Sequence, residues 1–288
     1  MRLRLRTRTF DLQRRVAVMA IVNRTPDSFS DGGRTWELDA ALDHAMAQVA
    51  AGADIIDIGG VKAGPGTDVD VDEERRRVLP FVEAFRARSD VPLSVDTFRA
   101  AVAADALDAG ADIVNDVSGM SEPDIADVVA ARPLTALVVM HAGGPPRTRP
   151  FRPTYLPDVT TAVAARLAGL VAEARRRGVP AERLVIDPGH DFGKNTAHSL
   201  ELTRRLPELC ALGYPVLVAL SNKDFLGEVL GVPVDQRAEA SLAAAVAAVS
   251  LGARIVRVHD TQPTVRAVRT LEAILGWRAP AVSARGLD

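Results

Sequence analysis

Apolar residues recur along the chain in short runs rich in Val, Ile and Leu, and longer stretches with helical spacing separate these runs. The eight runs read RVAVMAIVN, ADIIDIGG, PLSVDT, ADIVNDVSG, LTALVVMH, RLVIDPG, PVLVALS and ARIVRVHD. Near-continuous apolar runs are typical of parallel strands that are buried on both faces. Each run is therefore predicted to be a strand of one parallel sheet.

The stretches between the runs carry the period of amphipathic helices, for example ELDAALDHAMAQVAAG and EERRRVLPFVEAFRAR. Three of them end at a glycine, Gly52, Gly110 or Gly252, followed by a tight turn into the next strand, which is a common helix stop. Eight strands alternating with helices predict a single (β/α)8 TIM barrel. A doubly wound open sheet is the alternative, and it is less favoured because the dinucleotide-binding fingerprint is absent.

The two ends of the chain have patterns of their own. The opening MRLRLRTRTF alternates Arg or Thr with Leu, and this period of two predicts a short N-terminal β-hairpin. A basic targeting peptide is the alternative, but no apolar signal core follows. Beyond Trp277 the apolar period stops, so we expect one domain over residues 1–277 and a flexible tail over residues 278–288.

Composition and charge narrow the possible functions. The formal net charge is −2, which gives no general reason to expect nucleic acid or an anionic membrane as a partner. The single cysteine, Cys210, excludes an internal disulfide and a multi-thiolate metal site. Because no apolar run is long enough to span a bilayer, we expect a cytoplasmic protein.

Polar residues stand at the carboxyl ends of the predicted strands, where barrels carry their chemistry. They are Asn23, Asp96, Asn115, Asp187, Ser221, Lys223, Arg257 and His259. A lone Asp or Asn after a strand is more often a turn-forming residue, but eight such residues on one rim predict a binding site. Carboxylates and amides suit a ligand with donors and acceptors, such as a fused heterocycle. Arg257 and His259 lie on the same side of one strand and suit an anion.

Five segments of the chain resemble, in order and spacing, the motifs of the dihydropteroate synthase family. They are MAIVNRTPDSFSDGG, SVDTFRAAVAADALDAGADIVNDVSG, DPGHDFGKN, SNKDFLGEVLG and RIVRVHD. The resemblance implies a (β/α)8 barrel and an alkyl or aryl transferase. That enzyme joins p-aminobenzoate to a 6-hydroxymethyl-dihydropterin, carried as its pyrophosphate, in folate biosynthesis. The resemblance also favours a homodimer.

The resemblance implies a role for each matching residue. The residues implied for the pterin are Asp96, Asn115, Asp187 and Lys223, with Phe192 near the ring. Those implied for the pyrophosphate are Asn23, Arg257 and His259, with Mg²⁺ between the pyrophosphate and Asn23. Those implied for the acceptor pocket are Phe29, Pro65 and Ser221. No protein nucleophile is implied, since the pyrophosphate leaves first and the arylamine attacks the resulting cationic methylene, with the electrostatics of the site supplying the catalysis.

The chain departs from the family pattern in the loop after the second predicted strand. The family reads Gly-Gly-Glu-Ser-Thr-Arg-Pro-Gly there, and this chain reads Gly-Gly-Val-Lys-Ala-Gly-Pro-Gly over residues 59–66. Ala63 thus replaces a threonine associated with the aminobenzoate, and Gly64 an arginine associated with the pyrophosphate. Losing one charged hydrogen bond costs about 10- to 100-fold in affinity. Lys62 either restores positive charge or is simply solvated.

Further departures lie in two later motifs. Asn222 stands where the family motif Ser-Arg-Lys has its arginine, and His190 and Asp191 stand where the family has an apolar residue and a glycine. Two main hypotheses stay open: a dihydropteroate synthase-type transferase whose activity these replacements call into question, or a divergent paralogue. The paralogue would bind a pterin-like heterocycle weakly, with little or no synthase activity or with a different acceptor. A corrinoid-linked methyltransferase is a third possibility, against which the TPDSFSDGG loop argues.

Overall fold

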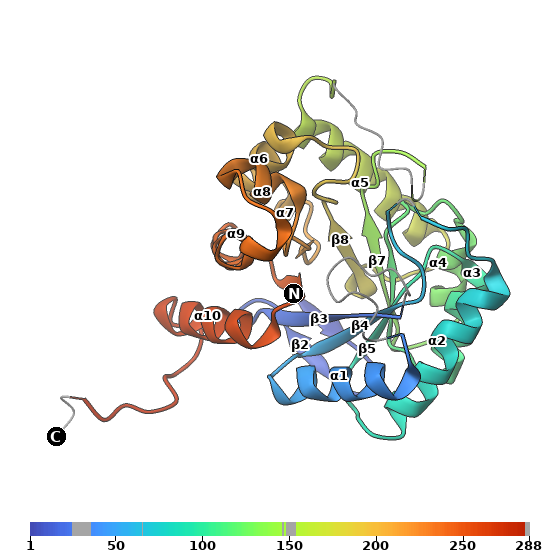
Figure 1. Cartoon of the computed structure of the whole chain (residues 1–288). Coiled ribbons are helices and arrows are strands. Elements are labelled where there is room, and N and C mark those ends of the chain that lie inside the picture. The colour runs from blue at the N-terminus through green and yellow to red at the C-terminus, as the bar shows by residue number, and fades with distance from the viewer. Residues whose placement is uncertain (25–35, 65, 146, 148–153, 286–288) are drawn as a thin grey trace.

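Eight parallel strands form a closed barrel at the centre of the molecule (Figure 1) and confirm the predicted (β/α)8 fold. The structure, a computed structural model, describes every residue except 25–35, 65, 146, 148–153 and 286–288. The strands follow the order β8-β7-β6-β5-β4-β3-β10-β9, and Ile186 pairs with Val216 to close the ring. Their bounds are β3 Ala17–Asn23, β4 Ile55–Gly59, β5 Leu93–Asp96, β6 Ile113–Asp116, β7 Ala136–Met140, β8 Leu184–Asp187, β9 Leu217–Val218 and β10 Ile255–Val258.

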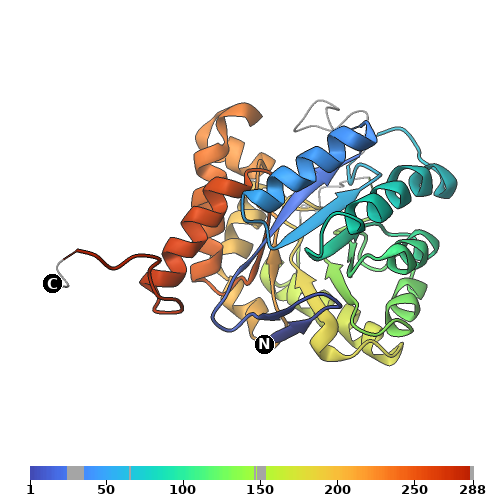
Figure 2. The ribbon, with the colours of Figure 1, turned by 90° about the horizontal axis from the view of Figure 1, so that it is seen from below.

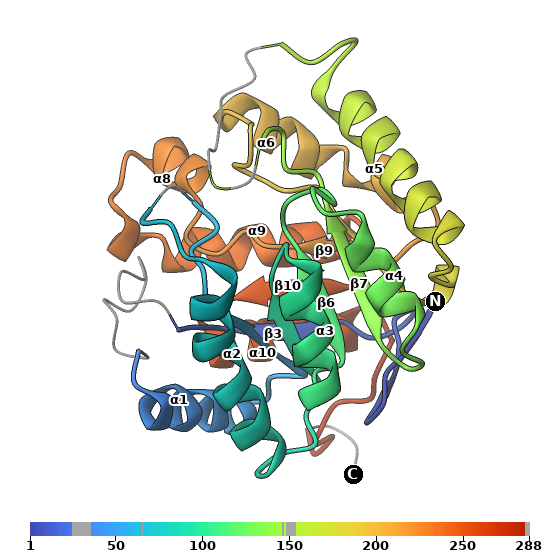
Figure 3. The same ribbon diagram turned by 90° about the vertical axis from the view of Figure 1, so that its right-hand side faces the viewer.

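Helices surround the barrel, and Figure 3 shows α2, α3 and α4 side by side on one flank. Asp70 and Asp158 start two of the helices, because their carboxylates accept from Glu73 N and Thr161 N. The bounds of the helices are α1 Leu38–Ala50, α2 Val71–Arg86, α3 Ala100–Ala109, α4 Asp124–Ala130, α5 Val159–Arg176, α6 Thr196–Arg204, α7 Leu206–Cys210, α8 Asp224–Leu230, α9 Ala238–Ser250 and α10 Thr261–Ile274, with 3₁₀ turns η1 Ala181–Arg183 and η2 Val234–Gln236.

The three predicted glycine stops lie where the chain turns from a helix toward the next strand. Gly52, Gly110 and Gly252 have φ angles of 96°, 118° and 117°. Backbone of this left-handed kind costs glycine little and other residues more. Each strand therefore begins in a defined register soon after its preceding helix ends.

The predicted N-terminal hairpin is present as β1 (Arg2–Arg4) and β2 (Thr9–Asp11), paired antiparallel. Figure 2 shows it at one end of the barrel, seen from below. Its apolar side chains, among them Leu3 and Phe10, are buried against barrel residues such as Met19 and Ile55. The hairpin thus closes the amino-terminal end of the barrel and leaves the opposite end for chemistry.

Inside the barrel, a polar layer lies above an apolar one. Ile55, Ile113, Val185 and Ile255 belong to the buried inner core beside the hairpin. Because side chains two positions apart on a strand face the same side, the next inward positions on these strands are Asp57, Asn115, Asp187 and Arg257. The change from apolar to polar along four strands sets the depth of the candidate site.

The last helix is fastened to the first barrel strand. Arg269 donates to Val16 O at 2.9 Å and to Asp54 Oδ2 at 2.5 Å, and Glu272 Oε1 accepts from Val16 N at 2.8 Å. Residues 278–285, beyond this helix, contain neither helix nor strand, and the proposed boundary at residue 277 stays a prediction. In the described part of the chain, each helix is too short or too polar to span a bilayer.

Candidate active site

A cavity of about 310 Å³ opens at the carboxyl ends of the strands. All eight predicted rim residues line it, and Phe192 lines it with them. The structure therefore brings together the side chains expected at the pterin and at the pyrophosphate, together with Ser221 of the expected acceptor pocket. The other two acceptor residues, Phe29 and Pro65, lie outside the described residues.

Arg257 forms the charged centre of the cavity floor. Its Nε donates to Asp57 Oδ2 at 2.6 Å, and its Nη2 donates to Asp96 Oδ2 at 3.0 Å. Burial opposes the charge of the guanidinium, but the two carboxylates outweigh it and hold the pKa of Arg257 above its ordinary value. Arg257 is thus a fixed cation at the base of the cavity.

Asp57 was not among the residues singled out in the sequence. It is fully buried in β4, and it also accepts from Asn115 Nδ2 at 3.4 Å. The sequence does contain a signal for Asp57. This residue stands two positions after the apolar Ile55, just as Asn115 follows Ile113 and Arg257 follows Ile255.

Asp96 is a buried carboxyl with an unusual titration. Burial raises its pKa to about 7; the charge of Arg257 opposes this rise, while Asp57, Glu74 and Asp116 add to it. Near neutral pH this residue therefore exists as a mixture of carboxylic acid and carboxylate.

Asp187, Lys223 and Phe192 line the same cavity. Asp187 Oδ1 accepts from Gly189 N at 2.7 Å. Burial raises the pKa of Asp187, and the Gly189 amide and the Lys223 charge limit the rise. The Lys223 ammonium lies 4.6 Å from the centre of the Phe192 ring, within the range of a cation–π contact. An apolar ring face, a carboxyl and an ammonium group thus line one cavity.

A buried lysine, Lys194, supports the loop that carries Phe192. Its Nζ donates to Gly189 O and Phe192 O, each at 2.8 Å, and contacts His141 Nδ1 at 2.9 Å. These bonds tie the loop after β8 to the end of β7. Lys194 stands in the DPGHDFGKN motif, but its supporting role could not be inferred from the motif alone.

Comparison with known proteins places this site in a family. A family model described as pterin binding enzyme matches residues 19–259. Inactive dihydropteroate synthase 2 of Mycobacterium tuberculosis is 49% identical over 278 residues, covering 95% of this chain and 87% of that protein. Dihydropteroate synthase of Escherichia coli is 42% identical over 259 residues, covering 90% of this chain and 91% of that protein. The chain belongs to the dihydropteroate synthase family.

Solved structures of the dihydropteroate synthase family share the whole fold. The Yersinia pestis synthase in a sulfonamide drug complex superimposes with a TM-score of 0.91 at 41% identity, covering 96% of this chain and all of that one. The Xanthomonas albilineans synthase in complex with 7,8-dihydropteroate gives 0.83 at 40% identity, covering 98% of this chain and all of that one. Differences between this protein and the dihydropteroate synthase motifs are therefore confined to local positions on a shared barrel.

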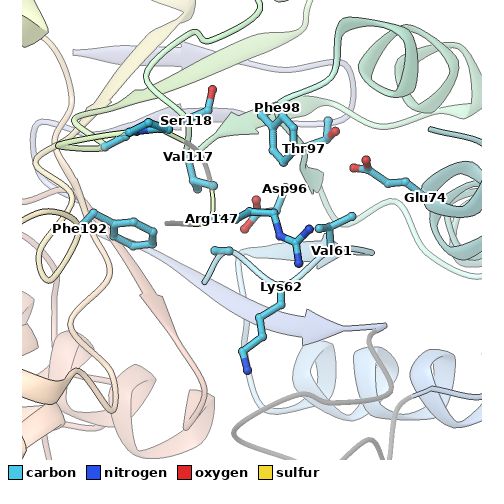
Figure 4. Close-up of a pocket in the computed structure, with 13 residues that line it drawn as sticks. Val61, Lys62, Glu74, Asp96, Thr97, Phe98, Val117, Ser118, Arg147 and Phe192 are labelled. Atoms are coloured by element: carbon cyan, nitrogen blue, oxygen red, sulfur yellow. The ribbon is translucent and has the colours of Figure 1, made fainter. Parts of the chain in front are cut away.

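The second-strand loop is one such difference from the dihydropteroate synthase motif. Lys62, Ala63 and Gly64 line the cavity. Figure 4 shows a small side pocket next to it, in which Arg147 reaches inward while the Lys62 side chain extends away from Asp96. Arg147 donates to Thr67 O at 2.7 Å and pairs with Asp68 at 3.3 Å. Arg147, rather than Lys62, is thus the cation directed into the side pocket.

Position 222 is the other difference, and its side chain is turned toward α9. Asn222 Oδ1 accepts from Ser241 Oγ at 3.4 Å, and Arg237 donates to Asn222 O at 3.0 Å. Beside it, Asp191 Oδ2 accepts from Asp224 N at 2.6 Å, and the two aspartates line the cavity. Where dihydropteroate synthases carry an arginine, this wall presents an amide and two carboxylates.

His190, the remaining departure in the DPGHDFGKN motif, is a buried neutral ring. Burial, with help from the nearby Lys194 and Lys223 charges, lowers its pKa to about 3. The ring stacks on Phe225 at 6.1 Å, and its Nε2 lies 3.0 Å from Thr203 Oγ1. A packing role explains these contacts.

Proposed function

We propose that this protein binds a pterin in its barrel cavity and couples it to an arylamine more weakly than a full dihydropteroate synthase does. One observation carries the proposal. The side chains expected at the ring line a single cavity, whereas the second loop and position 222 lack the arginines of the family motif. Relatives 49% identical to this chain are named inactive dihydropteroate synthase 2. Their name supports a site that keeps its ring-binding residues but couples the ring weakly.

The floor of the cavity supplies acceptors and donors that suit a pterin edge. An ionised Asp96 would accept two parallel N–H bonds from an aminopyrimidinone, as carboxylates do from guanidinium groups. Asn115 Oδ1 is buried and has no hydrogen-bond partner in the described part of the chain. Because buried acceptors are normally satisfied, a ligand N–H would complete it.

The pyrophosphate is the part of the substrate for which binding is weakened. Arg257, His259 and Asn23 line the cavity where the anion would lie, but Gly64 offers no guanidinium. The described residues hold no cluster of three His, Cys, Asp or Glu side chains suited to a metal. A lone Asn23 oxygen fits Mg²⁺, which keeps several waters and is held largely by substrate phosphates. When bound there, Mg²⁺ would neutralise part of the anion's charge.

Full synthase activity is the second candidate. The retained ring and anion residues favour it, as does the 42% identity to the protein named dihydropteroate synthase in Escherichia coli. The two candidates differ in rate and in pyrophosphate affinity, and not in the site they use.

The test is an assay with the pterin pyrophosphate, p-aminobenzoate and Mg²⁺, together with complementation of a strain that lacks the synthase. We expect little turnover from the natural chain, and a gain when the motif residues are restored in A63T/G64R/N222R. One charged hydrogen bond regained should raise pyrophosphate affinity about 10- to 100-fold. The matched control is A63T/G64Q/N222Q, which places polar side chains at the same positions without charge. Natural-chain turnover equal to that of a full synthase would refute weak coupling.

We also propose a homodimer and a cytoplasmic location. The alanine-rich helix α9 exposes Ala243 and Ala247, and small residues let helices approach closely, which supports the homodimer expected from the family. A cytoplasmic location stays the expectation drawn from the sequence.

A further inference from the structure

Asp57 lies beneath the candidate site and connects a residue expected at the pterin, Asn115, with one expected at the pyrophosphate, Arg257. It is fully buried in β4, and Oδ2 accepts from Arg257 Nε and Asn115 Nδ2. Arg257 in turn reaches Asp96 through Nη2. Asn115, Asp57, Arg257 and Asp96 thus form one chain of polar contacts that runs from β6 through β4 and β10 to β5.

We infer that Asp57 is a positioning residue, which aims the Arg257 guanidinium and the Asn115 amide at the ligand. The inference rests on the pterin and pyrophosphate subsites proposed above. An arginine side chain has five N–H donors in a rigid plane. Once Asp57 holds Nε and Asp96 holds Nη2, the plane is fixed and Nη1 is left for a ligand anion.

The charge of Asp57 matters as well as its shape. A buried guanidinium without a carboxylate partner is costly, and the second carboxylate, on Asp96, is the one expected at the pterin. Without the Asp57 charge, Arg257 would pair with Asp96 alone and compete with the ring for it. Because Asp57 shares the charge of Arg257, the guanidinium can serve the anion subsite while Asp96, 3.0 Å away, stays available to the ring.

The Asp96 titration gives a readout that a purely structural role would not move. Asp96 is faced by Arg257 from β10, Asp57 from β4, Glu74 from α2 and Asp116 from β6. Asp57 raises the pKa of Asp96 and Arg257 lowers it. Removing the Asp57 charge therefore lowers this pKa, so the pH at which pterin binding reaches half its maximum should fall.

The variant is D57N, which keeps the shape and removes the charge. The matched control is D54N, because Asp54 is a buried carboxyl in the same segment that pairs with Arg15 and Arg269 instead of the cavity residues. The first measurement uses ligand-free, ¹⁵N-labelled protein, in which the Arg257 Nε–H signal is assigned by its loss in R257K. We expect slow exchange in the natural chain and in D54N, and at least about tenfold faster exchange in D57N, since neutral acceptors hold a donor less tightly.

The second measurement is calorimetry with two separate probes, inorganic pyrophosphate with Mg²⁺ and 6-hydroxymethylpterin. D57N should weaken pyrophosphate about 10- to 100-fold and shift the pterin midpoint to lower pH, whereas D54N should change neither. D57E, which restores the charge, should recover part of both effects. If D57N does not fold, D57S, which is neutral as well, replaces it in all measurements.

The outcomes distinguish a failure of the proposed function from a failure of the role assigned to Asp57. Natural protein that binds neither probe would overturn the proposed function, and the Nε–H exchange would still decide whether Asp57 fixes Arg257. Unchanged exchange in D57N, or unchanged binding of the two probes where the natural protein binds them, would overturn the role of Asp57.

Discussion

Asp96 has to satisfy two opposing conditions. Its carboxylate form is the one that can accept N–H bonds from a ring edge, yet its burial favours the neutral acid and raises the pKa to about 7. The nearby Arg257 charge limits the rise. The pH therefore controls how much of the protein is competent to accept those bonds.

Pterin affinity should rise with pH across neutrality. A group with a pKa near 7 is about one-tenth ionised at pH 6 and about nine-tenths ionised at pH 8, so affinity should increase about tenfold over this interval. The sign follows from the bound form, because protons leave Asp96 as the pH rises. Calorimetry with 6-hydroxymethylpterin at several pH values measures the slope.

The control for this pH dependence is D96N, which cannot ionise. It should bind the pterin weakly and with little change between pH 6 and pH 8. A profile in D96N as steep as in the natural chain would assign the titration to another group.

At the residue scale, sequence patterns located the rim but not the contacts beneath it. Asn115 and Arg257 could be identified from their motifs, whereas Asp57 and Lys194 act through partners on other strands and loops. Such partners depend on which strands become neighbours, and β4 lies far from β10 in the chain although they flank β3. The direction of Lys62 and Arg147 likewise depends on loop conformation, which period and motif do not specify.

Among the elements, the loop after β8 is held by the buried amine of Lys194, whose pKa burial lowers to about 7. Lys194 is 1% exposed, and three of its contacts are to backbone carbonyls, at Gly189, Phe192 and His141. Few donors can satisfy several converging carbonyls at once. The placement of Phe192 at the cavity wall therefore follows from Lys194.

Replacing Lys194 with Met should destabilise the protein by about 3 kcal/mol. Met has a similar length but no donor, and each buried acceptor left unsatisfied costs about 1–3 kcal/mol. Urea denaturation gives the change in the free energy of unfolding. K62M is the matched control, and since Lys62 lies nearer the surface, its change should stay below about 1 kcal/mol. Equal effects of the two substitutions would contradict the role of Lys194.

For the whole molecule, the proposed homodimer predicts a specific response to charge on α9. Light scattering should give twice the 30.6 kDa mass of the chain, and A243R/A247R should give the single mass with an unchanged circular dichroism spectrum, because arginines there would be buried without partners in a dimer. A172R, on the exposed face of α5, is the control and should leave the mass unchanged. A natural chain that is monomeric would refute the proposal.

The overall architecture was the most predictable property. The eight apolar runs became β3 to β10 because parallel strands buried on both faces leave a strong pattern in the sequence. The glycine stops could be predicted because the left-handed backbone at these turns favours glycine. The PVLVALS run formed only a two-residue strand, Leu217–Val218, since its following residues turn toward the cavity as part of the rim. Local rules thus specify the barrel, and irregular backbone at its mouth does not follow from them.

The position of β3 between an early strand and the last strand also affects how this chain folds during its synthesis. Strand β3 sits between β4 and β10, so the first barrel strand to leave the ribosome waits for the last one before its second edge is covered. Such an open edge can pair with other chains. The nascent protein is therefore exposed to misassembly for most of its synthesis, and chaperones that shield strand edges should matter more to it than its compact final form suggests.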